Sequence, residues 1–265
     1  MTILALGPEG TFSHELAYRL FGEDVELVPT IHRIFVQVEK GGFQGLIPLE
    51  NSEAGGVGPT LDGLLRYRVF IKGEVNMPVH HYLVSSDPMD KAERLFVHPQ
   101  THEQCSELVD SLEIPVIHTS SNAESARDLL KCPRSAAIVS LLTTRIHSLP
   151  VIKERVENNP SNVTRFVLIS STPGPEDGAR KCSIIVDPKK DRSGLLYDLL
   201  GIFARRGINL TRIESRPSKR GMGSYVFFLD FLRTGDCRDA LAELTGMTSV
   251  KYLGCYSQLE VPEWK

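Results

Sequence analysis

Short apolar runs alternate along the N-terminal part of the chain with segments whose apolar residues recur at helical spacing. Such runs are typical of buried strands, and helical spacing is typical of helices that cover a sheet. Strands that alternate with helices predict βαβ units and a mainly parallel sheet. We expect two α/β lobes, connected by crossovers near residues 77–85 and 155–163, with a cleft between them. The expected strands are Ile3–Leu6, Val25–Val28, Phe43–Ile47, Val69–Met77, Val79–Ser85, Leu95–His98, Ile114–His118, Ser135–Val139 and Val163–Ile169.

Capping residues and apolar faces mark the helices between these strands. Thr30 and Pro59 suit helix starts, and Gly22 and Gly41 suit helix ends. The expected helices are His14–Phe21, 30–40, 59–67, 100–112, 122–130 and Leu141–Ile146.

The C-terminal part has a different order of elements. A stretch rich in proline and glycine, Ser170–Gly178, predicts a linker. We therefore expect a domain over residues 1–172, a linker over 173–180 and a second domain over 181–265. The order of elements in the second domain is βαββαβ, which predicts a ferredoxin-like unit. The exposed edges of such a sheet favour pairing between subunits, so we expect a homo-oligomer. Its expected elements are Cys182–Asp187, Ser193–Arg206, Ile208–Glu214, Ser224–Phe231, Asp236–Gly246 and Val250–Tyr256.

Three junctions between a strand and the next helix are rich in glycine, hydroxyl and amide residues. They are Gly7–Ser13, Pro48–Pro59 and Thr119–Asn122. A helix N-terminus presents free backbone N–H groups and a positive dipole end, so each junction suits an anion. In open α/β sheets, ligands bind beyond the carboxyl ends of the strands, where these junctions are expected. An ordinary helix cap is the alternative interpretation of Ser13.

A fourth segment leads from a polar loop into a strand. Asn158–Ser161 has loop chemistry, because Pro160 biases the residue before it away from the helical region. Thr164 and Arg165 then stand at the entry to the strand, which is a suitable place for a hydroxyl and a fixed cation that contact a ligand. The simpler interpretation of these two residues alone is a strand threonine beside a solvated arginine.

Composition and charge exclude several other classes of protein. The net charge of −3 over 265 residues gives no general attraction to nucleic acid or to an anionic membrane. No apolar run reaches the ~20 residues of a membrane span, and the N-terminus leads straight into a strand and a glycine turn, unlike a signal peptide. The five cysteines are widely spaced and odd in number, so neither a disulfide framework nor a zinc site is indicated. His80 and His81 point to opposite faces of an expected strand, which argues against a metal site. We expect a protein of the reducing cytoplasm.

Several separated motifs follow one another along the N-terminal part: GPEGTFS at Gly7–Ser13, IPLENS at Ile47–Ser52, HPQ at His98–Gln100 with Gln104 and Cys105, and NVTRF at Asn162–Phe166. In this order they resemble the motifs of the prephenate dehydratase family. The C-terminal part resembles an ACT regulatory domain of the phenylalanine-sensing type, on the motifs GLLY at 194–197, GINL at 207–210 and IESRP at 213–217. Together these motifs extend over nearly the whole chain.

The resemblance implies a two-lobed, periplasmic-binding-protein-like catalytic domain with the active site between the lobes. The implied reaction converts prephenate to phenylpyruvate, water and carbon dioxide in phenylalanine biosynthesis. Formation of an aromatic ring drives it, so we expect no metal and no cofactor. The resemblance makes Thr164 the essential residue, and we expect its hydroxyl to donate a hydrogen bond to the leaving ring hydroxyl. Because no chorismate mutase segment precedes the first strand, a monofunctional enzyme is expected. The expected substrate-binding residues are Thr11, Ser13, Asn51, Ser52, Gly55, Gln100, Ser121, Arg165 and Phe166.

The ACT resemblance implies L-phenylalanine as a feedback effector. We expect it to be enclosed across a subunit interface of a homodimer or homotetramer. Leu195 is bulkier than the alanine usual in the family, and Asn122 and Asn158 stand where threonine and aspartate are usual. The expected effector-binding residues are Gly194, Leu195, Leu196, Asn209, Leu210, Glu214, Ser215, Arg216 and Pro217.

Some alternatives stay open at this point. Arg165 either holds a substrate carboxylate or serves the structure, since on a strand it points opposite to Thr164. Glu50 is expected to be structural, because a carboxylate beside a dianion is unfavourable. Arogenate, which has an amine in place of the keto group, is an alternative substrate. A non-catalytic, two-lobed amino-acid sensor is the alternative function, and the intact Thr164-Arg165-Phe166 argues against it.

Overall fold

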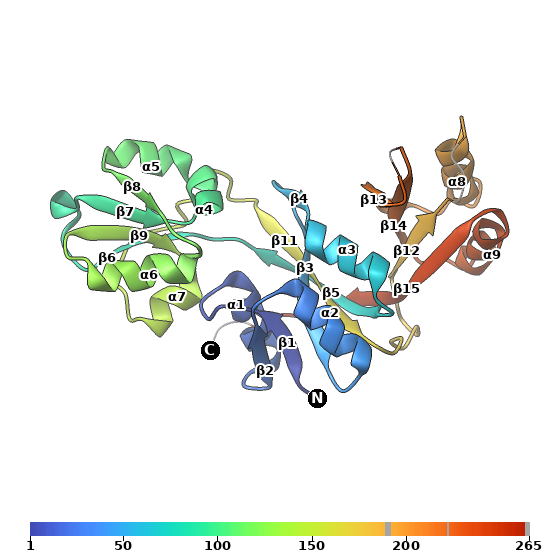
Figure 1. The fold of residues 1–265 in the computed structure, drawn as a ribbon, viewed down its shortest axis with the longest axis horizontal. Coiled ribbons are helices and arrows are strands. Elements are labelled where there is room, and N and C mark those ends of the chain that lie inside the picture. The colour runs from blue at the N-terminus through green and yellow to red at the C-terminus, as the bar shows by residue number, and fades with distance from the viewer. Residues whose placement is uncertain (189–191, 222, 263–265) are drawn as a thin grey trace.

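The apolar runs of the N-terminal part form strands in two separate sheets (Figure 1). The computed structural model describes residues 1–188, 192–221 and 223–262. In the first lobe, β1 (Ile3–Leu6), β2 (Val25–Val28) and β3 (Gln44–Asn51) are parallel, whereas β11 (Val163–Ser170) and β5 (Phe70–Pro78) continue the sheet in antiparallel pairs. The prediction of a mainly parallel sheet is therefore wrong. The chain leaves this lobe along β5 and returns along β11, so these neighbouring strands run in opposite directions.

Three helices cover the sheet of the first lobe. Helices α2 (Ile31–Lys40) and α3 (Gly58–Arg66) pack on one face, and α1 (Phe12–Phe21) packs on the other. A two-residue strand, β4 (Gly55–Gly56), pairs with the end of β3. Thr11 caps α1 by accepting a hydrogen bond from the backbone N–H three residues later, which fixes the loop before this helix.

The second lobe has a five-stranded sheet of order β10-β6-β9-β7-β8, also mixed. Cys105 interrupts the predicted helix over 100–112. The backbone N–H of Asn158 donates to the Gln104 carbonyl (2.7 Å) and its side chain accepts from the Glu107 N–H (3.2 Å), so the returning crossover divides the helix. Strand β10 was not predicted, because all four of its residues are exposed and show no buried face. The elements are β6 (Tyr82–Ser85), η1 (Met89–Lys91), β7 (Arg94–Val97), α4 (Pro99–Gln104), α5 (Ser106–Leu112), β8 (Val116–His118), α6 (Asn122–Lys131), β9 (Ser135–Val139), α7 (Leu141–Ile146) and β10 (Val151–Glu154).

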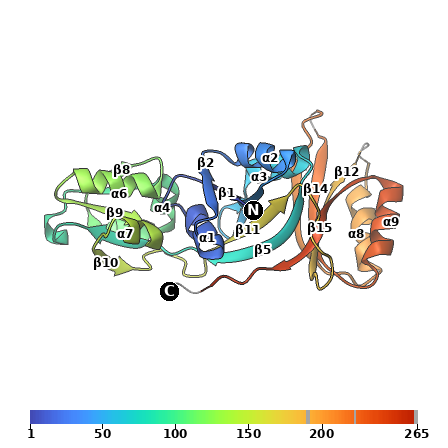
Figure 2. The same ribbon diagram turned by 90° about the horizontal axis from the view of Figure 1, so that it is seen from below.

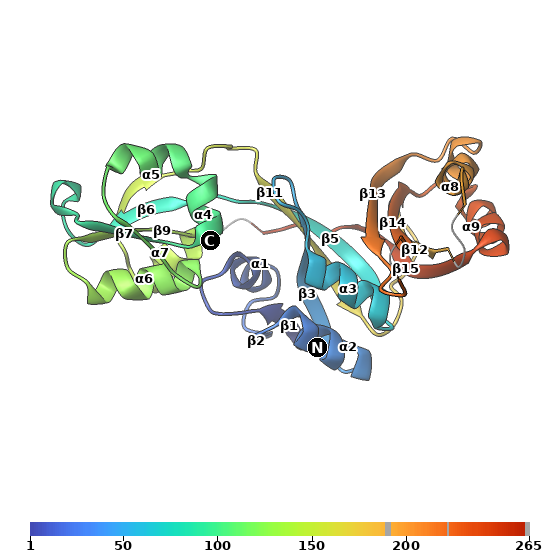
Figure 3. The same ribbon diagram turned by 45° about the horizontal axis from the view of Figure 1, so that its top comes forward.

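The C-terminal part confirms the predicted βαββαβ unit, with strand order β13-β14-β12-β15 and both helices on one face (Figure 2). The end of β15 pairs in parallel with β5, Ser257 opposite Gly73, so this sheet continues that of the first lobe. The second lobe, the first lobe and this unit lie in a row (Figure 3). Residues 263–265 of the expected second domain lie outside the described residues. The elements are β12 (Lys181–Asp187), α8 (Leu195–Ala204), β13 (Leu210–Pro217), β14 (Tyr225–Leu232), α9 (Cys237–Met247) and β15 (Ser249–Gln258).

A disulfide joins Cys182 on β12 to Cys255 on β15, contrary to the expectation from cysteine spacing. The two residues are 73 positions apart in the chain. They are directly opposite each other in the register of the two antiparallel strands. This pairing exists only in the folded sheet, which explains why the spacing of the cysteines gave no sign of it.

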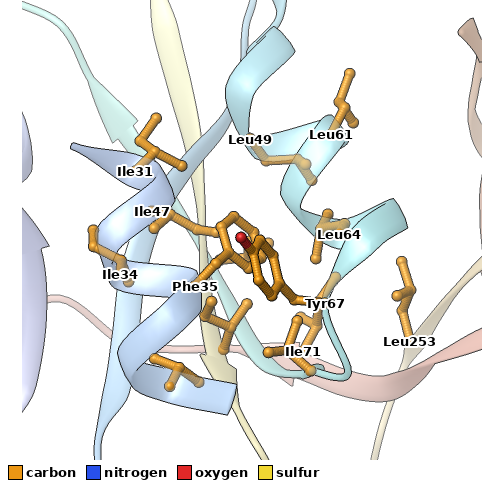
Figure 4. Packing of buried hydrophobic residues seen from close by; sticks show 14 of the residues in the cluster. Ile31, Ile34, Phe35, Ile47, Leu49, Leu61, Leu64, Tyr67, Ile71 and Leu253 are labelled. Carbon is orange, nitrogen blue, oxygen red and sulfur yellow. The ribbon is translucent and has the colours of Figure 1, made fainter. Parts of the chain in front are cut away.

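One hydrophobic cluster fills the space between the first-lobe sheet and helices α2 and α3 (Figure 4). The rings of Phe35 and Tyr67 stack with their centroids 5.6 Å apart, and Leu61 and Leu64 lie beside them. Gly63 permits this arrangement, because a Cβ at that position would collide with the Phe35 ring. In the described ranges, no helix combines the length and apolar character needed to cross a bilayer.

Substitution Gly63→Ala is expected to lower the free energy of unfolding by about 1–3 kcal/mol, because extra volume in a filled core forces neighbouring side chains out of position. Gly246→Ala is the matched control. Gly246 lies in α9, and a Cβ there meets nothing within 4 Å, so this change should raise the free energy of unfolding by about 0.5–1 kcal/mol. Urea unfolding of both variants measures the two effects. Equal effects would contradict close packing at Gly63.

Candidate active site

A cavity of about 410 Å³ lies between the two lobes. Strand ends and helix N-termini from both lobes line it. The polar residues of the first lobe at this cavity are Thr11, Ser13, Asn51 and Thr164, and Phe166 adds an aromatic wall. The crossover and the second lobe contribute His81, His98, Gln100, Thr101, Gln104, Ser120, Ser121 and Asn122. The structure thus brings together seven of the predicted catalytic and substrate-binding residues: Thr11, Ser13, Asn51, Gln100, Ser121, Thr164 and Phe166.

Thr164 stands opposite Asn51 in the register of β11 and β3. The Asn51 Nδ2 donates a hydrogen bond to the Thr164 Oγ1 at 3.0 Å. The Asn51 Oδ1 accepts bonds from the backbone N–H groups of Glu53 and Ala54, both at 3.0 Å, which fixes the end of the amide that faces Thr164. Because Oγ1 accepts this bond, the Thr164 hydroxyl proton is left to donate into the cavity.

Arg165 does not line the cavity, which favours the structural alternative over substrate binding. Neighbouring strand residues point to opposite faces, and the Arg165 side chain is buried on the face away from Thr164. Its guanidinium bonds the carboxylates of Glu50 (2.9 Å), Glu74 (2.7 Å) and Asp230 (2.6 Å). Burial alone disfavours the charged form, but the surrounding acidic groups, Asp230 foremost, outweigh it and raise the pKa of Arg165. This is the structural role that the sequence had left open.

Ser52 and Gly55 also lie outside the cavity lining, so their predicted contact with substrate stays a prediction. The Ser52 Oγ accepts a bond from the Val163 N–H at 3.0 Å and donates to the Asn162 Oδ1 at 3.4 Å. Gly55 adopts a φ of 75°, which favours glycine, in the short strand β4. Both residues shape the loop that holds Asn51.

Helix N-termini supply the positive potential of the cavity. Thr11 caps α1, and Ser121 caps α6 by accepting from the Glu124 N–H at 3.1 Å. The caps take the N–H groups of His14 and Glu124, and the other first-turn N–H groups of these helices have no partner within their own helix and are left as donors for an anion. The lining side chains of the described chain include no Lys, Arg, Asp or Glu. In the described ranges, no three His, Cys, Asp or Glu side chains are grouped as metal ligands would be.

The two crossovers between the lobes meet at Glu157. Its carboxylate accepts from the His81 backbone N–H (2.9 Å) and bonds the His80 Nδ1 (2.7 Å). The His81 ring is buried and its Nε2 bonds the Gln104 Oε1 at 2.9 Å, which makes Nε2 the protonated nitrogen. Burial lowers the pKa of His81, so the ring is neutral near pH 7. Both histidines lie in the crossover and not on the predicted strand over 79–85.

Sequence reasoning missed several side chains of the second lobe that line the cavity. Asn122 was noted only as a departure from the family, yet its Oδ1 accepts from the Thr101 Oγ1 at 2.8 Å at the cavity wall. The HPQ motif marked this region, but only its Gln100 was predicted to bind substrate, and the neighbouring Gln104 was given no role. His81 was weighed only as a metal ligand. The signal for these residues was their position at strand ends beside helix starts.

The free energy of unfolding is expected to fall as the pH is lowered from about 6.5 to about 5. Because burial lowers the pKa of His81, the unfolded chain binds a proton in this range that the folded chain refuses, and stability therefore rises with pH. His81→Gln should reduce this slope by up to about 1.4 kcal/mol per pH unit. His14 and His98, whose pKa values burial also lowers, act in the same direction and stay in the variant. Urea unfolding across this range checks the prediction, and an unchanged slope would contradict it.

The predicted effector residues fall into two groups in the C-terminal unit. Gly194, with a φ of 78°, precedes α8, which starts at Leu195, while Glu214 and Arg216 lie on β13 and face the first lobe. The Arg216 Nη2 lies 3.6 Å from the Asp62 carboxylate. In the described part of the chain, no hydrogen bond or ion pair joins the α8 group to the β13 group. The remaining members are Leu196 on α8 and Asn209, Leu210, Ser215 and Pro217 at or on β13.

The cavity between two α/β lobes is the architecture of a periplasmic-binding-protein-like domain, and the βαββαβ unit is joined to it as a second, ferredoxin-like domain. The model of the family described as "Prephenate dehydratase" matches residues 3–174, and that described as "ACT domain" matches residues 182–245. The chain belongs to the prephenate dehydratase family.

Known proteins resemble this chain over most of its length. A bifunctional chorismate mutase/prephenate dehydratase of Pseudomonas aeruginosa is 37% identical over 239 residues, which cover 88% of this chain and 65% of that relative. A prephenate dehydratase of Methanocaldococcus jannaschii is 33% identical over 84% of this chain and 85% of its own length. Among solved structures, a prephenate dehydratase from Arthrobacter aurescens in complex with L-Phe matches with a TM-score of 0.86 at 31% identity, covering 97% of this chain and 90% of that one. The chain therefore spans about two thirds of the length of the first relative.

Proposed function

We propose that the protein is a prephenate dehydratase, which converts prephenate to phenylpyruvate with loss of water and carbon dioxide. Residues 1–172 would form the catalytic domain, 173–180 the linker and 181–265 the ACT domain. The observation that carries the proposal is the Thr164 hydroxyl, which Asn51 leaves free to donate into a cavity ringed by helix N-termini. Because the substrate is a biosynthetic intermediate, we place the reaction in the cytoplasm.

The reaction requires the substrate to be held as a dianion while a hydroxide leaves. The N-termini of α1 and α6 bind the two carboxylates through backbone N–H groups and helix dipoles. As carbon dioxide departs, the electron pair of the broken C–C bond enters the ring, which becomes aromatic and expels the ring hydroxyl. Thr164 stabilises the developing hydroxide by a hydrogen bond. Because an alcohol is a weak acid, Thr164 gives up its proton only as the C–O bond breaks. The hydroxide then leaves as water, and solvent returns a proton to the Thr164 oxygen.

The cavity chemistry favours prephenate over arogenate. Arogenate carries an ammonium group, which a protein normally binds with a carboxylate. The described lining contains no Asp or Glu, and its polar groups are hydroxyls, amides and neutral imidazoles. A keto group needs only a hydrogen-bond donor, which this lining supplies.

Regulation by L-phenylalanine is the second part of the proposal. The effector would lie between the start of α8 and strand β13, at an interface of a homodimer or homotetramer. In support, Ile213 and Tyr225 are exposed hydrophobic residues, 47% and 48% accessible, on β13 at the sheet edge and on its neighbour β14. Titration calorimetry with L-phenylalanine should give binding that weakens in Glu214→Gln; no heat at millimolar ligand would remove this part of the proposal.

Incubation with prephenate at neutral pH, with chelator present, tests the catalytic part. Phenylpyruvate, detected by its absorbance in alkali, should accumulate with the enzyme and not with buffer alone. If a folded protein fails on prephenate but converts arogenate to phenylalanine, the substrate assignment is wrong. If neither compound is turned over while an amino acid binds, the alternative of a non-catalytic sensor holds.

A further inference from the structure

Two neighbouring residue pairs on β3 and β11 face opposite sides of the same sheet. Thr164 pairs with Asn51 and faces the cavity, whereas Arg165 pairs with Glu50 and faces the C-terminal domain. A single peptide unit on each strand separates the two pairs. The backbone position of the hydroxyl and the amide is therefore tied to the position of the ion pair behind them.

The C-terminal domain completes this ion pair. Asp230 on β14 accepts from the Arg165 Nη1 at 2.6 Å, and Tyr256 on β15 lies 2.9 Å from the Arg165 Nη2. The Ser183 hydroxyl on β12 bonds both of these partners, at 2.5 Å each. Two strands of the C-terminal domain thus bond one side chain of the catalytic domain, and a third strand holds those two bonding partners.

Arg212 on β13 holds the other member of the ion pair. Its Nε lies 2.7 Å from the Glu50 Oε2, while the Glu50 Oε1 bonds Arg165 at 2.9 Å. The Arg212 side chain is 7% exposed and that of Glu50 is 31% exposed, so the arginine end of this contact is shielded from solvent. Its guanidinium also bonds Glu214, whose carboxylate lies against Gly56 of the catalytic domain. Both carboxylate oxygens of Glu50 are therefore fixed by cations, one from each domain.

We propose that Glu50 and Arg165 are positioning residues for Asn51 and Thr164, and that Arg212 and Asp230 of the C-terminal domain complete their arrangement. The inference rests on the proposed function, in which Thr164 acts on the substrate. A fully bonded and mostly buried network holds its members in one geometry, whereas an incomplete one relaxes. Loss of Arg212 therefore lets Glu50 turn, and the ends of β3 and β11 shift with it. Glu214 belongs to the segment proposed to take the effector, so a ligand that engages its carboxylate acts directly on Arg212.

Substitutions on the C-terminal domain test the inference without touching the cavity. Arg212→Met is expected to lower kcat for prephenate by about 10–100-fold with KM within about twofold, because a small misplacement of a catalytic group is costly. Lys219→Met is the matched control, since Lys219 also joins the C-terminal domain to a carboxylate of the first lobe, Asp62, at 2.7 Å. This control should leave kcat within about twofold. Arg212→Lys should restore part of the lost kcat.

Hydrogen exchange gives a readout that does not depend on catalysis. Mass spectrometry without substrate should show faster exchange in peptides over Gln44–Asn51 and Val163–Ser170 in Arg212→Met than in wild type or Lys219→Met. If exchange there is unchanged, the inference is overturned, whether or not prephenate is converted. A kcat loss that vanishes after correction for the folded fraction also overturns it, since the network then only holds the domains together. If the wild-type protein does not convert prephenate, that result contradicts the proposed function and not this inference.

Discussion

Replacing Thr164 with valine is expected to reduce kcat for prephenate by about 10²–10⁴-fold while the protein stays folded. Valine keeps the β-branched shape that suits a strand, so the substitution removes the hydroxyl and little else. Asn51 loses one acceptor but its Nδ2 still has the Asn162 Oδ1 at 2.7 Å. The free energy of unfolding should therefore change by no more than about 1 kcal/mol. Phenylpyruvate formation and urea unfolding, measured on the same preparation, give both quantities.

Thr164→Ser is the control that separates the hydroxyl from the shape of the side chain. Serine retains the donor, so kcat should stay within about tenfold of wild type. Wild-type kcat in the valine variant would exclude a role of Thr164 in the departure of the ring hydroxyl. An equal loss in both variants would show that the methyl group of Thr164 matters as much as its hydroxyl.

Asn51→Asp adds a second arm to this test. A carboxylate at residue 51 accepts where the amide donates, so the Thr164 proton would turn toward residue 51 and away from the cavity. Turnover should fall although the hydroxyl is still present. A variant with full activity would show that the direction of this hydrogen bond does not matter.

Local pattern predicted the strands and the polar junctions, because both depend on neighbouring residues. The strand period of two indicated that Arg165 points away from Thr164. Its partner Asp230 lies 65 positions along the chain. Local sequence patterns do not extend over so many positions, so the charge network became visible only in the structure. The Cys182–Cys255 disulfide escaped prediction for the same reason.

Residues of the second lobe were harder to predict than those of the first. Thr101 and Asn122 reach the cavity because α4 and α6, which follow different strands, start side by side. The break at Cys105 depends on Asn158 in the returning crossover, which inserts its amide between α4 and α5. A helix that another segment divides keeps a continuous helical pattern in its sequence. Such breaks become visible only when both segments are placed.

Removal of the Arg165 charge should have the largest effect on stability. Arg165→Met is expected to lower the free energy of unfolding by about 3–5 kcal/mol, because it leaves buried carboxylates without their cation. The side chains of Glu74 and Asp230 are only 7% and 4% exposed, so water does not replace the lost partner. Lys181 keeps its bond to Glu74 at 2.6 Å and limits the loss at that residue. Urea unfolding monitored by far-UV circular dichroism measures the change.

Arg205→Met provides the matched control for burial. Arg205 lies 2.8 Å from Glu243, a distance similar to those at Arg165, but the two side chains are 61% and 34% exposed. Loss of this exposed pair should leave the free energy of unfolding nearly unchanged. Arg165→Lys should recover only part of the stability, since one ammonium group does not reproduce the planar set of donors that reaches Glu50, Asp230 and Glu74 together. A similar loss in Arg165→Met and Arg205→Met would mean that burial of the network adds nothing, and the rigid link between the cavity and the C-terminal domain would then lose its physical basis.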